Sequence, residues 1–138
     1  MKLAPYLHFS GDCAEAMRFY AGVFGVEPGI TFTYAQSPMA EQTPPEWRDK
    51  IMHTRITVSD TELMASDGPP GGPAQKMQGC TLSINVDDPA EAERIFAALA
   101  EGGSVRMAIG ETFWAERFGM LTDRFGVAWM VNCEKVRP

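Results

Sequence analysis

The chain contains one short sequence twice, 76 residues apart. Residues 12–18 read Asp-Cys-Ala-Glu-Ala-Met-Arg, and residues 88–94 read Asp-Pro-Ala-Glu-Ala-Glu-Arg. In each copy an Asp is followed three residues later by a Glu, the pattern of a capping box at the start of a helix. The two copies therefore predict helices over residues 12–24 and 88–101. A duplicated helix in a chain of 138 residues favours a fold made of two similar halves.

The strands predicted around the two helices occur in the same order in both halves. In the first half, alternating apolar residues predict strands at 3–9, 30–36, 51–58 and 61–66. In the second half they predict strands at 79–86, 105–109, 112–122 and 126–134. A Pro-rich segment, 37–50, also predicts a short helical turn at 45–48. Each half thus has the order β-α-β-β-β.

This order predicts an α+β fold. A βαβββ half leaves one apolar sheet face that it cannot bury alone, so we expect the halves to pair. We expect two βαβββ modules that form a curved, incomplete barrel with the helices outside and a concave pocket face. The predicted domain is 1–138, with modules at 1–67 and 79–138 and a Pro- and Gly-rich linker at 68–78.

Composition excludes several classes of partner. The net charge of −6 disfavours a phosphate backbone or an anionic membrane. No run approaches the roughly 20 apolar residues of a membrane span, and the N-terminus lacks a leader-like apolar stretch, so we expect a cytoplasmic protein. The three cysteines are widely spaced, which indicates reduced thiols rather than a zinc site. No glycine-rich nucleotide loop is present, and we predict no cofactor.

Several segments carry a resemblance to a known superfamily. They are residues 5–16, 19–20, 23–25, 51–53, 63–67, 113–123 and 125–132. With them the chain resembles the PhnB-like branch of the vicinal oxygen chelate superfamily, which contains glyoxalase I, bleomycin and fosfomycin resistance proteins and extradiol dioxygenases. Members of this branch are sometimes described as demethylubiquinone methyltransferases, but the absence of a glycine-rich cofactor loop does not favour that activity here.

The resemblance implies where a metal ion would bind. Metal-using members hold a divalent ion with His, Gln or Glu side chains, two from each half, on the first and last strands. Counting seven residues back from each helix-capping Asp gives Pro5 and Thr81, neither of which suits a transition metal. The last-strand positions, 64–66 and 129–131, also lack such donors. We therefore predict no metal, with a displaced set that includes His53, Glu62 or Asp67 as the alternative.

Strand alternation predicts which side chains line the pocket. If the pocket shares a face with residue 5, Leu7 and Phe9 face it and His8 turns toward the helix. His53 and Arg55 share one strand face, where they form either an anion-binding pair or an ordinary solvated surface.

The second half contributes a more polar wall. Thr81, Ser83 and Asn85 alternate with aliphatic residues and are predicted to face inward; the alternatives are an outward sheet edge and a buried polar network satisfied by water. Arg117 either binds an acidic substrate or pairs with a carboxylate, and Trp47 either covers the cavity or contacts a second copy. The remaining candidates for the pocket are Phe32, Tyr34, Trp114 and Met130.

Three functions fit these features. The first is a metal-free small-molecule binding protein of the PhnB-like, bleomycin-resistance type, whose ligand is unknown. The second is a metal-dependent lyase, isomerase or dioxygenase of the same superfamily with displaced ligands. The third is an assembly protein with a vestigial pocket. All three are compatible with a homodimer. Exposed sheet edges favour pairing with a second chain, and superfamily relatives commonly dimerise.

Overall fold

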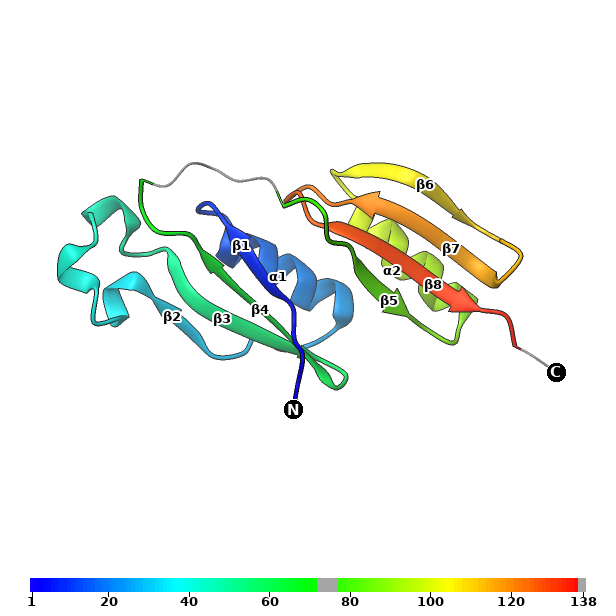
Figure 1. Ribbon diagram of the computed structural model, residues 1–138, viewed down its shortest axis with the longest axis horizontal. Helices are drawn as coiled ribbons and strands as arrows, with labels where there is room; N and C mark the ends of the chain where they lie inside the picture. Colours follow the sequence, from blue (N-terminus) through cyan, green and yellow to red (C-terminus); the bar gives the residue numbers. More distant parts are fainter. Residues whose placement is uncertain (72–76, 137–138) are drawn as a thin grey trace. The chain divides into compact units, whose positions relative to one another are not determined.

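The computed structural model describes residues 1–71 and 77–136, so residues 72–76 of the predicted linker lie outside the described residues. The chain divides into two compact units, residues 1–75 and 76–138 (Figure 1). We describe each unit by itself. In the part of the chain that is described, none of the helices combines the length and apolarity needed to cross a membrane.

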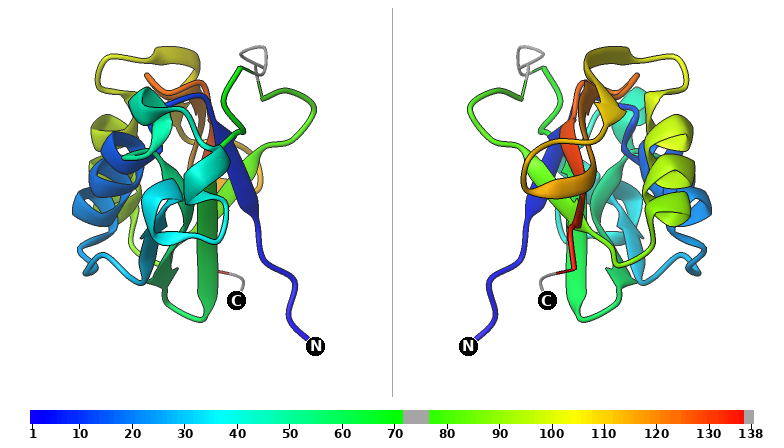
Figure 2. Two further views of the ribbon diagram at one scale, coloured as in Figure 1. Left: turned by 90° about the vertical axis from the view of Figure 1, so that its left-hand side faces the viewer. Right: turned by 90° about the vertical axis from the view of Figure 1, so that its right-hand side faces the viewer.

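Unit 1 is a four-stranded mixed sheet with one helix. Its elements are β1 (Tyr6–Phe9), α1 (Cys13–Phe24), β2 (Thr31–Thr33), β3 (Ile51–Val58) and β4 (Thr61–Asp67). The strand order is β1-β4-β3-β2, with β1 parallel to β4 and the other pairs antiparallel. Figures 1 and 2 show α1 against one face of this sheet. The predicted order is confirmed, although the strand expected at 30–36 is only three residues long.

The core of unit 1 lies between α1 and the sheet. One stripe of α1 is apolar, as a helix that packs on a sheet requires, and it is buried with the alternate residues of β1, β3 and β4. The buried apolar side chains include Leu7, Phe9, Ala16, Tyr20, Ile56 and Leu63.

Between β2 and β3, three short 3₁₀ helices follow one another: η1 (Tyr34–Gln36), η2 (Ala40–Gln42) and η3 (Pro45–Trp47). The helical turn predicted at 45–48 is thus confirmed. Among the side chains that tie the segment to the rest of the unit, Trp47 Nε1 donates to the Gly68 carbonyl at 3.0 Å, and Lys50 Nζ donates to the Gly11 carbonyl at 2.9 Å. Trp47 is therefore an anchor within unit 1, and it is partly exposed.

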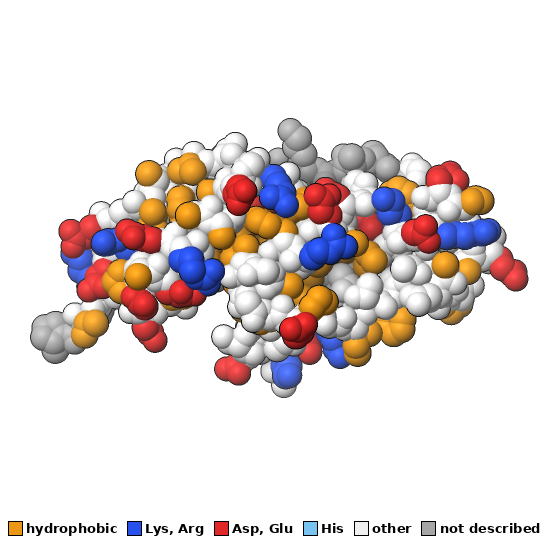
Figure 3. Space-filling model, turned by 180° about the vertical axis from the view of Figure 1, so that it is seen from behind, with side chains coloured by type: hydrophobic (Ala, Val, Ile, Leu, Met, Phe, Trp, Pro, Cys, Tyr) orange, Lys and Arg blue, Asp and Glu red, His pale blue; other side chains and the backbone are white. Residues whose placement is uncertain are grey.

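Unit 2 repeats this plan. Its elements are β5 (Leu82–Asn85), α2 (Pro89–Ala100), β6 (Ser104–Gly110), β7 (Ala115–Thr122) and β8 (Ala128–Glu134). The strand order is β5-β8-β7-β6, with β5 parallel to β8. Helix α2 contacts β6, β7 and β8, and its buried residues pack on the sheet. Figure 3, the view from behind Figure 1, shows charged and apolar side chains intermixed on that side.

The two helices begin differently, and one prediction is wrong. In α2, Asp88 Oδ1 accepts the Ala90 N–H at 3.0 Å, as an N-cap residue should. In α1, the Asp12 side chain makes no capping bond, because its backbone (φ −110°, ψ 17°) is not extended like that of an ordinary N-cap. Asp67 Oδ1 accepts the Cys13 N–H instead, at 3.0 Å. The capping box predicted for the first helix therefore does not form.

Candidate functional site

Each sheet has one face that its helix does not cover, which we call the open face of that unit. Strand pairing identifies its residues, because directly paired residues lie on the same face. In unit 1, Tyr6 and Arg55 both pair with Met64, and Phe32 pairs with His53. The polar and aromatic side chains of this open face include Tyr6, His8, Phe32, His53, Arg55 and Glu62.

Tyr6 is the centre of a cluster of rings on this face. Its hydroxyl lies 3.0 Å from His53 Nδ1, in a hydrogen bond whose direction depends on the imidazole tautomer. The Tyr6 ring centroid is 5.1 Å from that of His8 and 5.7 Å from that of His53. Tyr6 is 39% exposed, so these rings offer a surface on which a ligand can rest.

His53 and Arg55 share the open face, as their alternation predicts. Arg55 Nη1 lies 3.5 Å from Glu62 Oε1, and both side chains are partly exposed. A ligand anion would have to compete with this carboxylate for the guanidinium. The pair therefore has the residue types of an anion site, but Glu62 already balances the charge of Arg55.

The face predicted for the first strand is inverted. Leu7 and Phe9, expected to line the pocket, are buried in the core at 6% and 4% exposure, while His8 lies on the open face. A shift of one residue exchanges the two faces of a strand. The prediction assumed that residue 5 shares a face with the pocket, and that assumption is wrong. In the connection to α1, Gly11 adopts a φ of +115°, which residues with a side chain rarely reach. The corresponding residue in unit 2 is Asp87, and there the predicted faces hold.

In unit 2, Ser83 and Asn85 lie on the open face, as predicted. Ser83 pairs with Met130 and Asn85 with Asn132, whereas Leu82 and Ile84 alternate with them toward the other face. Met130, a predicted pocket residue, is therefore on the same face as Ser83. Thr81 immediately precedes β5 and is half-buried.

A chain of hydrogen bonds runs across this face. Trp114 Nε1 donates to Asn132 Oδ1 at 3.3 Å, and Asn132 Nδ2 donates to Asn85 Oδ1 at 3.2 Å. Asn85 Nδ2 then donates to Ser83 Oγ at 3.4 Å. The Trp114 ring also packs edge-on against its neighbours, with centroids 4.8 Å from Phe113 and 5.2 Å from Phe118. Trp114 was a predicted pocket residue, and here it orders the polar side chains.

Asn132 is a residue of this site that sequence reasoning missed. It is 8% exposed and joins Trp114 to Asn85. The signal was available, because Asn132 follows Met130 by two residues and so lies on the same strand face.

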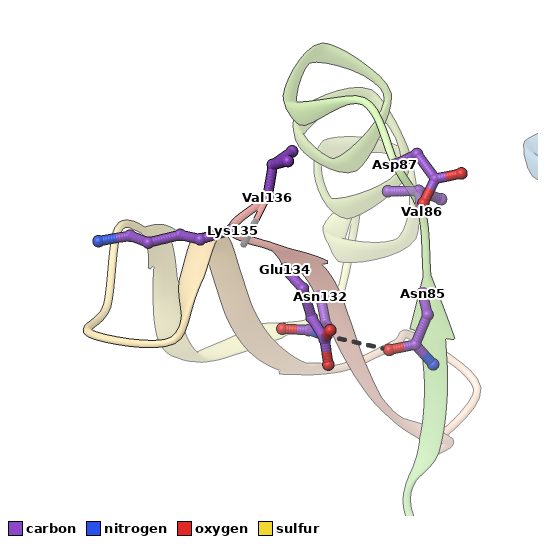
Figure 4. A pocket seen from close by; sticks show the side chains of 7 residues that line it. All are labelled: Asn85, Val86, Asp87, Asn132, Glu134, Lys135 and Val136. Carbon is purple, nitrogen blue, oxygen red and sulfur yellow. Dashed lines mark hydrogen bonds between the residues drawn. The ribbon is translucent and has the colours of Figure 1, made fainter. Parts of the chain in front are cut away.

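A pocket of about 500 Å³ adjoins this chain of hydrogen bonds (Figure 4). Asn85 and Asn132 form part of its wall, and the other lining residues are Val86, Asp87, Glu134, Lys135 and Val136. In Figure 4 the Lys135 side chain extends away from the two asparagines, and its Nζ lies 3.2 Å from Glu111 Oε2. The pocket lies where the parallel strands β5 and β8 end, and carboxylates are part of its rim.

Arg117 and Tyr34 were predicted to line the pocket, but in the structure they have other roles. Arg117 Nε donates to Glu93 Oε1 of α2 at 2.9 Å, which places it on the helix side of its sheet and raises its pKa. This is the carboxylate pairing that sequence analysis gave as one alternative. Tyr34 is buried, its hydroxyl donates to the Asp67 carbonyl at 2.8 Å, and burial raises its pKa. Neither side chain lies on an open face.

The three cysteines are free thiols, as expected. Cys13 and Cys133 are buried, and burial raises the pKa of both. These two thiols are therefore protonated at neutral pH, and neither suits nucleophilic chemistry.

The metal donors implied by the resemblance are not assembled. Asp67, an alternative ligand, is 1% exposed, and its carboxylate accepts the N–H groups of Gly11, Cys13 and Ile51 at 2.7, 3.0 and 2.8 Å. Within residues 1–71 and 77–136, no group of three or more His, Cys, Asp or Glu side chains could hold a metal ion. The donor set in these residues does not fit the ion that metal-using relatives hold.

Comparisons with known proteins agree with this architecture. The chain is 51% identical to protein PA1353 from Pseudomonas aeruginosa, whose crystal structure matches with a TM-score of 0.89 over 99% of both chains. It is 36% identical to Protein YjdN from Escherichia coli strain K12, over all of this chain and 99% of that protein.

A more distant structure shares the fold. The putative 3-demethylubiquinone-9 3-methyltransferase, PhnB protein, from Bacillus cereus is 24% identical, with a TM-score of 0.80 over 96% of this chain and 99% of that one. The predicted fold class, α+β of the glyoxalase/bleomycin resistance/dioxygenase type, is confirmed by these and other solved structures.

The family model described as 3-demethylubiquinone-9 3-methyltransferase matches residues 1–132. The chain therefore belongs to this PhnB-like family, and it shares the fold of the glyoxalase/bleomycin resistance/dioxygenase proteins.

Proposed function

We propose that this protein binds a small organic molecule at its open sheet faces without the help of a metal ion. The observation that carries the proposal is the hydrogen-bond chain from Trp114 to Ser83 beside a pocket of about 500 Å³. Small-molecule sites typically have volumes in this range and a few oriented polar groups, which Asn85 and Asn132 supply in this wall. A sheet face that served only to support the fold would not need ordered amides.

The donor chemistry supports binding without a metal. Pro5 and Thr81 stand at the positions where the resemblance implies ligands, and Asp67 is committed to three backbone N–H groups. Of the family description we adopt the relationship and not the methyl transfer, since the sequence offers no glycine-rich loop for a nucleotide-like methyl donor.

We also predict a homodimer in the cytoplasm. The exposed residues Val105 (53%) and Met107 (48%) lie on β6, at the edge of its sheet, and favour a second copy, because sheet edges and exposed apolar side chains both favour association. Light scattering on the purified protein measures the oligomeric state, and a monomer at micromolar concentration would contradict the dimer.

A thermal-shift screen tests the proposed function. Protein dialysed against EDTA is heated with Ni²⁺, Zn²⁺, Mn²⁺ or a panel of neutral, anionic and cationic aromatic compounds, since a specific ligand raises Tm by mass action. We expect organic compounds to raise Tm in EDTA, and Asn85→Ala to abolish the shift while the exposed control Gln42→Ala retains it. Binding that requires a stoichiometric ion, or no shift with any compound, overturns the proposal.

A further inference from the structure

We propose that the open face of unit 2 selects flat, uncharged carbonyl compounds. This inference rests on the proposed function and adds the class of ligand. It follows from three observations: the direction of the hydrogen-bond chain, the charges at the pocket rim and the aromatic side chains beside it.

Trp114 fixes the direction of the whole chain. An indole N–H can only donate, so the group of Asn132 that faces it must be the carbonyl oxygen Oδ1. Asn132 is 8% exposed, so its Nδ2 has little competition from water and donates to Asn85 Oδ1. Asn85 in turn must present Nδ2 to Ser83 Oγ. One side chain that cannot accept thus orients two amides that would otherwise be free to turn over.

The end of the chain offers donors to a ligand. Ser83 Oγ accepts from Asn85, and among the described residues no group accepts the Ser83 hydroxyl proton. Asn85 Nδ2 carries a second hydrogen that the chain does not use. Both side chains are exposed, so two donors lie side by side on the open face. Their natural partner is the oxygen of a carbonyl group, which accepts and cannot donate.

The rim of the pocket disfavours a charged acceptor. Asp87 and Glu134 line the same pocket as Asn85 and Asn132, and the Lys135 ammonium lies against Glu111. A carboxylate ligand would meet two like charges at short range, whereas a neutral carbonyl would not. The electrostatics therefore favour an uncharged oxygen over an anionic one.

The rings beside the chain favour a flat ligand. Trp114 is 41% exposed, and its edge-on contacts with Phe113 and Phe118 hold the indole. Because its Nε1 bonds Asn132, the ring lies within one side chain of the pocket wall. A planar compound that lies on the open face beside this ring would meet the donors of Asn85 and Ser83 with its carbonyl oxygen.

A matched series of ligands tests this selection. Benzamide, benzoate and benzylamine share a ring but carry a neutral, anionic or cationic group, and their Kd values are measured by NMR titration of the full chain. We expect benzamide to bind at least about tenfold more tightly than either charged compound. Ser83→Ala should weaken benzamide binding about five- to tenfold, since it removes a single hydrogen bond. Ser83→Thr keeps a hydroxyl and should retain benzamide binding, and the exposed control Ser104→Ala should leave benzamide binding unchanged.

Trp114→Phe separates selection from stacking. It keeps a ring but removes the N–H, so Asn132 is free to turn and the preference for benzamide over benzylamine should fall about fivefold or more. Equal binding of the three compounds, no effect of Ser83→Ala, or binding of other aromatic compounds but not benzamide overturns this inference and leaves the proposed function standing. If no aromatic compound raises Tm in the thermal-shift screen, both this inference and the proposed function are overturned.

Discussion

The two units share their element order but differ in the chemistry of their open faces. Unit 1 carries ionisable groups there, with the Tyr6–His53 hydrogen bond and the Arg55–Glu62 ion pair. Unit 2 carries neutral amides, with Asn85 and Asn132 linked to each other. In both units, the residues that form the core face the helix. The open faces were therefore free to diverge. The duplication preserved a scaffold and not a site.

The units also differ in how a buried carboxylate is used. Asp67 accepts N–H groups from Gly11, Cys13 and Ile51, which are far from it in the sequence. Asp123 accepts the N–H groups of Phe125 and Val127 and the indole N–H of Trp129, all within six residues. One aspartate thus connects separate elements, and the other closes a local turn.

Asp67→Ala should have the largest effect. It would leave buried N–H groups without acceptors, at a cost of about 1–3 kcal/mol for each group, so the free energy of unfolding should fall by about 3 kcal/mol or more. Urea denaturation measures the change, with Asp60→Ala in the exposed β3–β4 turn as the control. A loss as small as that of the control would show that the long-range connection does not stabilise unit 1.

Gly119→Ala tests how closely α2 approaches its sheet. An added Cβ would lie 2.6 Å from Phe96 Cε2 and 2.9 Å from Ile109 Cα, so packing must shift. We expect a loss of about 1–3 kcal/mol in the free energy of unfolding, typical of overpacking. In Gly110→Ala the new Cβ has no neighbour within 4 Å. Equal stabilities of the two variants in urea would contradict the close contact.

The smallest expected effect comes from comparing the residues at which the two helices begin. Asp88→Ala removes the bond to the Ala90 N–H and should cost about 1 kcal/mol, as N-cap substitutions typically do. Asp12→Ala removes no capping bond, and the free energy of unfolding should fall by only a few tenths of about 1 kcal/mol. Thermal or urea unfolding compares them. If Asp12→Ala is the more destabilising variant, Asp67 is not the group that caps α1.

The sequence predicts the elements better than their details, for physical reasons. Helix and strand periodicity is local, so the order of all eight strands and both helices is confirmed. Capping is not local in unit 1: Asp12 and Asp88 stand in matching sequences, yet the group that caps α1 comes from residue 67. For Arg117 the sequence leaves open an acidic substrate or a carboxylate partner, and the structure shows a carboxylate, Glu93, which lies on another element.

The site was predicted in part. Alternation placed Ser83, Asn85 and Met130 on one face of unit 2 and His53 and Arg55 on one face of unit 1. It failed for Leu7 and Phe9, because it started from the assumption that residue 5 shares a face with the pocket, and a shift of one residue exchanges the two faces. Hydrogen bonds between side chains, such as the one from Trp114 to Asn132, depend on tertiary packing that one sequence does not reveal.

Positions matched by the 76-residue offset face opposite ways in β1 and β5, and this limits how the two halves can be recombined. A chimera that grafts the β5 segment in place of β1 by simple sequence alignment would direct Ser83 and Asn85 into the apolar interior and expose Leu82 and Ile84 to water. Any exchange of strands between the halves, whether by gene conversion or by protein engineering, must therefore shift the grafted strand by one residue.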